Sequence, residues 1–507
     1  MQQGQRERAP ASRQATRPDP ALRGPVLSFD AWDRMALAPY TPQPRGVTVI
    51  APALAAALDL IDCGFTDTHS GPAGCYAVPS AGAVYPYEFA VIIAEQGRPA
   101  VFHADPLRRR IARLAAPDSA GALLNAAGLA LPSRSGALIA IIARPWLSIR
   151  KYGDRGYLYT QLDSAHVAVN LLGVAAERFS AGLRLRFGRE ALAELLTVAE
   201  SCREVHSVLR IEPAAHSGSA AGRPQVGPPA WQTSGSGPEK PSWLERMCWE
   251  SLCTLVPDSA DAVRQPDTYQ HTTADLPGSA DGTPTPAQQW SELSYRRRSS
   301  KGFRPGTVPV GDVTRILAMA RAPLAVDTMD TTGFLDAAGL RTTLVARSIS
   351  GLVPGAYHLS VAHGTAPFGS EPPTSAVRYT PVATAASAMT GGTDEEIVRA
   401  CMHQEHLGTC AAAVLFHAER DKIVGRAPTA MRDLMFRAGG LAQLYYLGAR
   451  SRSVGVTAVG GFDSARWRAL AGLDEDQELL YLLLLGVDGG PGVKWDRLQT
   501  AYPQGEE

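Results

Sequence analysis

The strongest constraint on the fold of this chain is a repeat with a fixed spacing. Ala137-Leu-Ile-Ala-Ile-Ile-Ala is typical of a buried strand, and so is Ala411-Ala-Ala-Val-Leu-Phe-His, which begins 274 residues later (411 − 137 = 274). A helical apolar pattern starts at Asp163 and another at Arg437, which are again 274 residues apart. This constant spacing predicts two copies of one structural plan within the chain.

Each copy mixes strands with helices. A β-rich stretch at 88–93 is followed by an apolar run at 100–103, and in the second copy the corresponding stretches lie at 340–345 and 355–358. Long helical patterns follow in both copies. The sequence therefore predicts an α+β fold.

Composition and punctuation divide the chain into segments. Its 507 residues are 45% apolar, which is enough for the cores of two or three domains. Gly, Pro, Ser and Ala crowd the middle, where a short amphipathic helix from Trp243 is expected. We expect a disordered tail at 1–26, a first half at 27–212, a linker at 213–288, a second half at 289–490 and a C-terminal tail at 491–507.

Charge and cysteine usage narrow the setting. The 49 basic and 49 acidic residues cancel, which gives no reason to expect nucleic acid or an anionic membrane as a partner. No secretory signal and no run of about 20 apolar residues is present. The seven cysteines have no zinc-site spacing, so no metal is expected. Reduced thiols in a cytoplasmic protein are the expectation.

Arg297-Arg-Ser299-Ser-Lys301 opens the second half, just before a probable helix from Val310. In an extended segment the alternate positions 297, 299 and 301 share one side and offer a guanidinium, a hydroxyl and an ammonium. Such a set suits a terminal phosphate. The alternative is a solvated basic turn at the start of a domain.

Pro79-Ser80-Ala81-Gly82, followed by Tyr85-Pro86, precedes a strand of the first half. Pro stiffens the backbone, and small residues let it approach a flat ligand closely. A purely structural turn would have the same composition.

Lys151-Tyr152-Gly-Asp-Arg-Gly-Tyr157 lies between the buried strand and the long helix of the first half. Lys and Tyr side by side supply a proton acceptor and a donor if burial lowers the pKa of the lysine. The alternative is a surface loop with Tyr157 packed inward.

Gly460-Gly461-Phe462 follows the long helix of the second half. This glycine turn can direct backbone N–H groups toward a ligand, or it can be a plain loop. His166 and His406 are possible ligands, but a single satisfied hydrogen bond for each is the simpler interpretation.

Together these motifs resemble the nitroreductase superfamily, and more narrowly the azoline dehydrogenases of thiazole/oxazole-modified peptide biosynthesis, of the streptolysin S, microcin B17 and thiopeptide types. Pro79-Ser-Ala-Gly and Lys151-Tyr-Gly-Asp-Arg-Gly-Tyr carry the narrower resemblance. The 297–303 stretch resembles the phosphate-binding start of the wider superfamily, and 460–462 resembles its loop beside the flavin ring. The likeness covers roughly 45–210 and 290–490.

The resemblance implies a specific site. Nitroreductases are homodimers with FMN at the subunit interface, and each site takes segments from both subunits. By this likeness Arg297, Ser299 and Lys301 would bind FMN, with Pro79, Ser80, Ala81, Gly82, Gly460 and Gly461 lining it. Lys151 and Tyr152 match the Lys-Tyr pair that the azoline dehydrogenases need for catalysis.

The two halves have complementary losses. The second half has Gly425 and Arg426 in place of the Lys-Tyr pair, and Thr331-Thr-Gly-Phe in place of Pro-Ser-Ala-Gly. The first half has neither the basic start nor Gly-Gly-Phe. We therefore expect an internal pseudo-dimer of two nitroreductase-like halves, each a mostly antiparallel sheet flanked by helices, with one working FMN site and one dead site.

The resemblance implies the oxidation of thiazoline or oxazoline rings in a ribosomally synthesised peptide, with reoxidation by O2. An azoline-containing precursor peptide, and a cyclodehydratase that makes its rings, are the expected partners. Two other functions stay open: an NAD(P)H-dependent nitro or enone reductase of the same fold, and a flavin-free peptide-binding scaffold. Simple reductases do not need the Lys-Tyr pair.

Overall fold

A computed structural model describes twelve stretches of the chain, with gaps between them. These are residues 51–65, 76–106, 110–153, 155–198, 203–214, 232–233, 286–322, 324–327, 339–362, 374–382, 391–421 and 428–490. The two tails, the helix expected from Trp243 and the Thr331 segment lie outside these residues, and so do Gly425 and Arg426.

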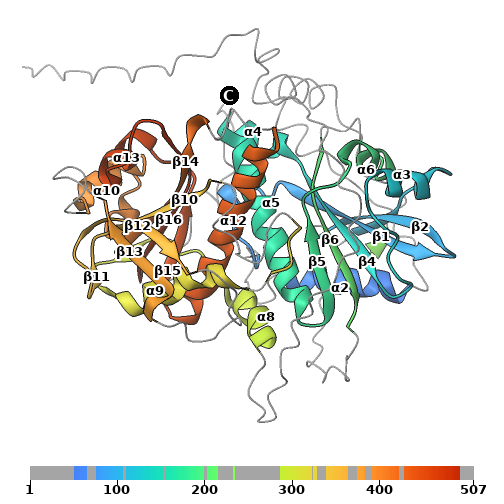
Figure 1. Cartoon of the computed structure of the whole chain (residues 1–507), viewed down its shortest axis with the longest axis horizontal. Coiled ribbons are helices and arrows are strands. Elements are labelled where there is room, and N and C mark those ends of the chain that lie inside the picture. Colours follow the sequence, from blue (N-terminus) through green and yellow to red (C-terminus); the bar gives the residue numbers. More distant parts are fainter. Residues whose placement is uncertain are drawn as a thin grey trace, which may run out of the picture.

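The described residues form two halves, each with an antiparallel sheet and helices on both of its faces (Figure 1). In the first half the elements are α2 (Pro52–Phe65), η2 (Ala81–Ala83), β1 (Tyr87–Glu95), β2 (Arg98–Asp105), β3 (Arg110–Arg113), α3 (Ala120–Ala126), β4 (Ala137–Ala143), α4 (Pro145–Tyr152), α5 (Arg155–Ala176), β5 (Phe179–Arg184), α6 (Arg189–Leu195), β6 (Glu204–Pro213) and β7 (Gln232–Thr233).

The second half repeats this succession. Its elements are α8 (Pro286–Arg296), β8 (Phe303–Arg304), β9 (Val308–Pro309), α9 (Val310–Ala318), η3 (Met319–Arg321), β10 (Arg341–Ala346), β11 (Ile349–Ser350), β12 (Gly355–Val361), η4 (Thr374–Ala376), β13 (Val377–Pro381), α10 (Asp394–Ala400), η5 (Glu405–Leu407), β14 (Ala412–Glu419), α12 (Pro428–Ser451), β15 (Gly455–Val459), α13 (Ser464–Ala471) and β16 (Gln477–Asp488).

The two sheets have the same topology. The first runs β5-β6-β4-β1-β2-β3, with β7 added at the edge, and the second runs β15-β16-β14-β10-β12-β13, with β8 pairing with β16. The pair β4–β6 changes register between Ile141 and Ile142, and the pair β14–β16 does so between Phe416 and His417. The α+β tandem fold predicted from the repeat is confirmed.

The central strands are buried on both faces, which explains their continuous apolar runs. In β4 the side chains of Ile139 and Ile141 face the core between the halves, whereas Leu138 and Ile142 face an outer core. Helices α3 and α6 cover that outer core in the first half. In the second half α10 and α13 cover its counterpart.

Helices α5 and α12 lie side by side between the two sheets (Figure 1). Both are buried over most of their length, and one continuous core joins their apolar side chains to both sheets. The helices approach closely at Gly439, where an added Cβ would lie 2.7 Å from the carbonyl oxygen of Leu162 and 2.8 Å from the Cβ of Ala165. A larger side chain at this position would push the two halves apart.

A buried polar network crosses the same interface. The amide nitrogen of Asn170 donates to the Gly64 carbonyl (2.6 Å) and to Ser294 Oγ (2.7 Å). Its amide oxygen accepts from Gln443 (3.0 Å) and from the Trp290 indole (3.3 Å). Because α5, α8 and α12 each contribute a partner, the network is complete only when both halves are docked.

Two boundary expectations are affected by the structure. Gln232 and Thr233, within the expected linker, form β7, which pairs in parallel with β3 of the first sheet. Helix α8 starts at Pro286, three residues before the expected start of the second half, and packs against α2 and α5 as well as α12. Among the described residues no helix is both long enough and apolar enough to cross a bilayer.

The Asn170 network gives a first prediction. Asn170→Ala would leave several buried polar groups in both halves without a partner, at a cost of about 1–3 kcal/mol for each group that water cannot reach. We expect the free energy of unfolding to fall by at least about 2 kcal/mol, as measured by urea denaturation. Glu194→Ala, at an exposed position on α6, is the control and should change it by less than about 0.5 kcal/mol. An equal, small effect of both changes would contradict the structural role of the network.

Candidate functional site

Lys151 and Tyr152 lie in the last turn of α4, directly after β4. The helix begins with Pro145 in its first turn and is anchored by Trp146, which is buried beneath the Arg144 guanidinium. It ends at Gly153, whose N–H donates to the Ile149 carbonyl (2.7 Å). The sequence predicted this pair at the end of a strand, and the structure adds the short helix that carries it.

Both side chains converge on Gly82. Lys151 Nζ donates to the Gly82 carbonyl at 3.2 Å. A Cβ added to Gly82 would lie 2.1 Å from Tyr152 Oη and 2.4 Å from Lys151 Nζ, so these two atoms are no farther apart than the sum of those distances. Gly82 also has a left-handed backbone, with φ of 57°. Both the conformation and the lack of space therefore favour glycine here.

The turn that holds Gly82 is anchored to α5 by Asp163. Ser80 Oγ donates to Asp163 Oδ2 (2.5 Å), and the Ala81 N–H lies 3.1 and 3.2 Å from the two carboxyl oxygens. Ser80 Oγ also accepts from the Tyr85 N–H (2.8 Å). Burial raises the pKa of Asp163 to about 7, although the hydrogen bonds from Ser80 and Ala81 oppose the shift.

The glycine loop of the second half meets this cluster through α5. The Tyr159 hydroxyl donates to the Gly460 carbonyl, and the Tyr159 ring packs edge-on against Tyr152, with 5.0 Å between the ring centroids. One turn earlier, the Arg155 guanidinium lies over the Phe462 ring and donates to the Phe462 carbonyl (3.4 Å). The two halves thus place Gly460–Phe462 beside the Lys-Tyr pair.

Arg297 connects the basic segment to the same region. It is only 4% exposed, and its guanidinium donates to the Ala77 (2.8 Å) and Tyr76 (2.9 Å) carbonyls, just ahead of Pro79. It also donates to Ser299 Oγ (3.2 Å). The residue predicted only as a phosphate ligand therefore also joins the two halves.

Ser299 and Lys301 are half-buried on the segment that follows Arg297. Ser299 Oγ is within 3.2 Å of the Tyr446 hydroxyl, which in turn accepts from the Ala458 N–H (2.7 Å), two residues before Gly460. Beside Lys301, Ser300 exchanges hydrogen bonds with Val456. The basic segment is thereby fixed to the strand that leads into the glycine loop.

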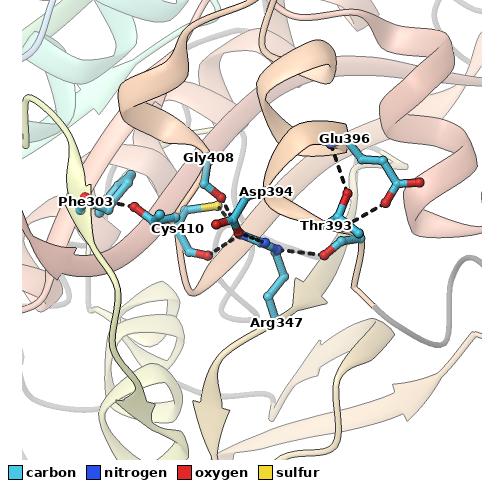
Figure 2. Close-up of polar contacts among 9 residues, drawn as sticks. Phe303, Arg347, Thr393, Asp394, Glu396, Gly408 and Cys410 are labelled. Carbon is cyan, nitrogen blue, oxygen red and sulfur yellow. Dashed lines mark hydrogen bonds and ion pairs between the residues drawn. The ribbon is translucent and has the colours of Figure 1, made fainter.

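The segment 391–410 borders the glycine loop on its other side, and Arg347 holds it (Figure 2). The Arg347 guanidinium donates to the carbonyls of Gly408 (2.6 Å) and Cys410 (2.7 Å) and pairs with Asp394 (2.5 Å). Burial raises the pKa of the Cys410 thiol to about 11, so it stays neutral.

From this segment Gln404 donates to the Gly461 carbonyl (3.2 Å). Met402, with a φ of 54° and 61% exposed, lies next to the same glycine. An exposed, conformationally strained apolar residue beside the glycine loop was not foreseen from the sequence.

The equivalent positions of the other interface, 274 residues away, carry different chemistry. Arg186 stands where the other interface has Gly460, Asp433 stands where it has Tyr159, and the two form an ion pair. Asp327 accepts from the N–H groups of Leu185 (2.8 Å) and Arg186 (3.1 Å). Arg437, also buried, occupies the position equivalent to Asp163.

The structure thus brings the four predicted motifs into one region built by both halves. His166 is not part of that cluster: its ring nitrogens lie 3.1 Å from Gln443 Oε1 and from the Tyr481 hydroxyl, and burial lowers its pKa to about 3. His406 lies in η5 with its carbonyl beside Gly302. Asp163 and Tyr159 were missed as site residues, although an acidic residue inside an apolar helix is a readable signal.

Comparison with known proteins agrees with this fold. Residues 295–487 match the model of the nitroreductase family. No curated protein matches the chain. A protein from Anabaena variabilis whose crystal structure is described as that of a nitroreductase is 17% identical, with 89% of this chain and 94% of that chain covered and a TM-score of 0.62. The nitroreductase fold is therefore shown across both halves.

Shorter matches have lower TM-scores. A chain of the E. coli microcin synthetase complex is 16% identical, covering 38% of this chain and 68% of its own, with a TM-score of 0.28. A nitroreductase-type protein from Ralstonia eutropha is 15% identical, covering 39% and 82%, with a TM-score of 0.26. At these TM-scores neither match adds to the fold assignment.

The buried carboxyl of Asp163 gives a prediction on stability against pH. A pKa raised from 3.8 to about 7 means that the stability which this group contributes is present below pH 4 and is lost as pH rises to about 7. Tyr87 and Tyr481, whose pKa values are raised, and His166, whose pKa is lowered, keep one charge state across this window.

We therefore expect the difference in unfolding free energy between wild type and Asp163→Asn to fall between pH 4 and pH 7. The decrease should be on the order of 4 kcal/mol, from about 1.4 kcal/mol per pKa unit. Urea titrations at five pH values measure it. Ser164→Ala, the neighbouring buried but non-titrating position, is the control and should give a pH-independent difference. A flat profile for Asp163→Asn would show that this carboxyl does not titrate in the window.

Proposed function

We propose that the protein is an FMN-dependent oxidoreductase that oxidises thiazoline or oxazoline rings of a ribosomally synthesised peptide to thiazoles or oxazoles. The observation that carries the proposal is the convergence of Lys151 Nζ and Tyr152 Oη on Gly82, next to the Gly460 loop of the other half. An acid–base pair set against a glycine loop suits proton removal beside a bound flavin.

The residues present fit FMN. Arg297, Ser299 and Lys301 supply a guanidinium, a hydroxyl and an ammonium for its phosphate. A Cβ added to Gly461 would meet its nearest neighbours, the Met402 sulfur and the Gln404 amide, only at 3.6 and 3.8 Å, so the backbone of this loop is open to close approach. Pro79–Gly82 would form the opposite wall.

The chemistry requires removal of one proton and one hydride. In an azoline the ring Cα–H is acidified by the adjacent C=N bond, and loss of this proton together with a hydride from Cβ creates the aromatic ring. Bound FMN would accept the hydride, and O2 would later reoxidise it. Lys151 and Tyr152 would hold the Cα proton and the charge that develops, one as the base and the other as its orienting partner.

The proposal also names partners and architecture. The substrate is an azoline-containing precursor peptide, of thiopeptide or related type, and a cyclodehydratase must act first because it makes the azoline. A cytoplasmic setting is part of the same proposal. The halves at 27–212 and 289–490 would act as one unit with a single FMN, because the Arg186–Asp433 ion pair stands at the equivalent place of the other interface.

The decisive experiment compares turnover of a thiazoline peptide under O2 with turnover of a nitroarene under NADPH, each by purified protein. Azole formation supports the proposal. Nitroarene reduction without azole formation would favour a simple reductase, and colourless protein that binds a peptide would favour a flavin-free scaffold.

A prediction on cofactor binding follows from the single site. FMN released by heat should amount to one per chain, measured by absorbance against amino-acid analysis, and a value near two would refute the single-site arrangement. Because Arg297 also joins the halves, Lys301→Met is the cleaner variant. It should weaken FMN binding roughly ten- to a hundred-fold, as expected for loss of a charged hydrogen bond. Arg298→Met, at the exposed neighbouring cation, should leave FMN affinity nearly unchanged.

A prediction on catalysis concerns the converging pair. Lys151→Ala and Tyr152→Phe should keep the fold and the bound FMN while slowing azole formation about 10²–10⁴-fold, the usual contribution of an acid–base group. Single-turnover absorbance of the flavin measures this step. Wild-type rates in both variants would disprove the catalytic assignment, and loss of flavin in both would make the pair structural.

A further inference from the structure

We propose that Asp163 is a positioning residue: by holding the Ser80–Tyr85 turn against α5, it sets the place of the Gly82 carbonyl and therefore of the Lys151 ammonium. The consequence for catalysis rests on the function proposed above, whereas the positioning itself does not.

The contacts form one continuous chain. The Asp163 carboxyl accepts from the Ser80 hydroxyl and from the Ala81 N–H, and the residue after Ala81 is Gly82, whose carbonyl accepts from Lys151 Nζ. The Ser80 hydroxyl also accepts from the Tyr85 N–H and so closes the turn at its far end. A single buried carboxyl thereby fixes both the start and the end of the segment that receives the lysine.

The turn needs such an anchor because its backbone is strained. Gly82, Ala83 and Tyr85 have φ values of 57°, 56° and 49°. Left-handed conformations are unfavourable for the two residues with side chains and persist only where surrounding contacts over-determine them. The side-chain anchor that the structure shows for this turn is Asp163, on a helix fixed between the two sheets.

The asymmetry of the chain points the same way. The position equivalent to Asp163 in the second half is Arg437, which carries donors and no acceptor. An acidic acceptor thus stands only at the interface that carries the Lys-Tyr pair. A carboxyl buried in an apolar helix is costly, and such groups concentrate at functional sites.

A first test measures the lysine without using the reaction. The chain has five lysines, at 151, 240, 301, 422 and 494, so amine labelling read by peptide mass spectrometry reports on Lys151 against internal references. In the FMN-loaded full chain, Asp163→Asn and Ser80→Ala should raise the labelling rate of Lys151 roughly five-fold, the equivalent of one ordinary hydrogen bond. Ser80→Thr, which restores the hydroxyl, should return it to the wild-type rate.

Asp327→Asn is the matched control. Asp327 is likewise a largely buried acid that accepts from two backbone N–H groups, but its partners are Leu185 and Arg186. Its substitution should leave Lys151 labelling unchanged. If Asp163→Asn and Ser80→Ala keep their FMN and their circular dichroism and Lys151 labelling still does not rise, the proposal is overturned. Should Asp163→Asn fail to fold, Ser80→Ala decides alone.

A second test measures coupling in the reaction. With a thiazoline peptide, Asp163→Asn should lower kcat about 10²-fold and change KM little, because a misplaced catalytic group affects the reacting geometry more than substrate binding. In a Lys151→Ala background the same substitution should cause no further loss. Fully additive losses would show that Asp163 acts independently of Lys151. If labelling behaves as expected but wild type oxidises no azoline, the positioning stands and the proposed function fails.

Discussion

The buried contact between α5 and α12 is the interaction on which the rest of the structure depends. Each helix is surrounded by apolar side chains, and their one polar network is complete only when Asn170 and Gln443 meet across the interface. Because a buried polar group without a partner is costly, this network permits one docking of the halves and excludes shifted ones. That single docking sets Tyr159 against Gly460, and every contact between the site motifs follows from it.

Duplication gave two interfaces related by one backbone plan, but their side chains have diverged. In a homodimer of identical subunits the two sites are equivalent by symmetry. In a fused chain each half has its own sequence, so one interface can keep Gly460, Tyr159 and Asp163 while the other carries Arg186, Asp433 and Arg437. The Arg186–Asp433 ion pair fixes the second interface as a structural joint, and this leaves the first interface to carry the chemistry.

The sequence predicted the local elements and the duplicated fold well, because periodicity and spacing are local signals. The strand at 137–143 and the helix through 163–172 lie where the pattern put them. It also grouped the four motifs, but only through resemblance. It could not show that Ser80 meets Asp163 across 83 residues, or that Arg297 binds carbonyls 220 residues away. Such long-range hydrogen bonds depend on the docking of whole helices, and no local pattern encodes them.

The double role of Arg297 links cofactor and architecture under the proposed function. The same guanidinium that would face the phosphate also donates to Tyr76 and Ala77 of the other half, next to the turn that carries Gly82. A ligand that binds only the docked state stabilises that state by mass action. FMN would therefore strengthen the docking of the halves as well as occupy the site between them. Since a neutral side chain at 297 would lose both contacts at once, flavin retention and the joining of the halves are coupled through one residue.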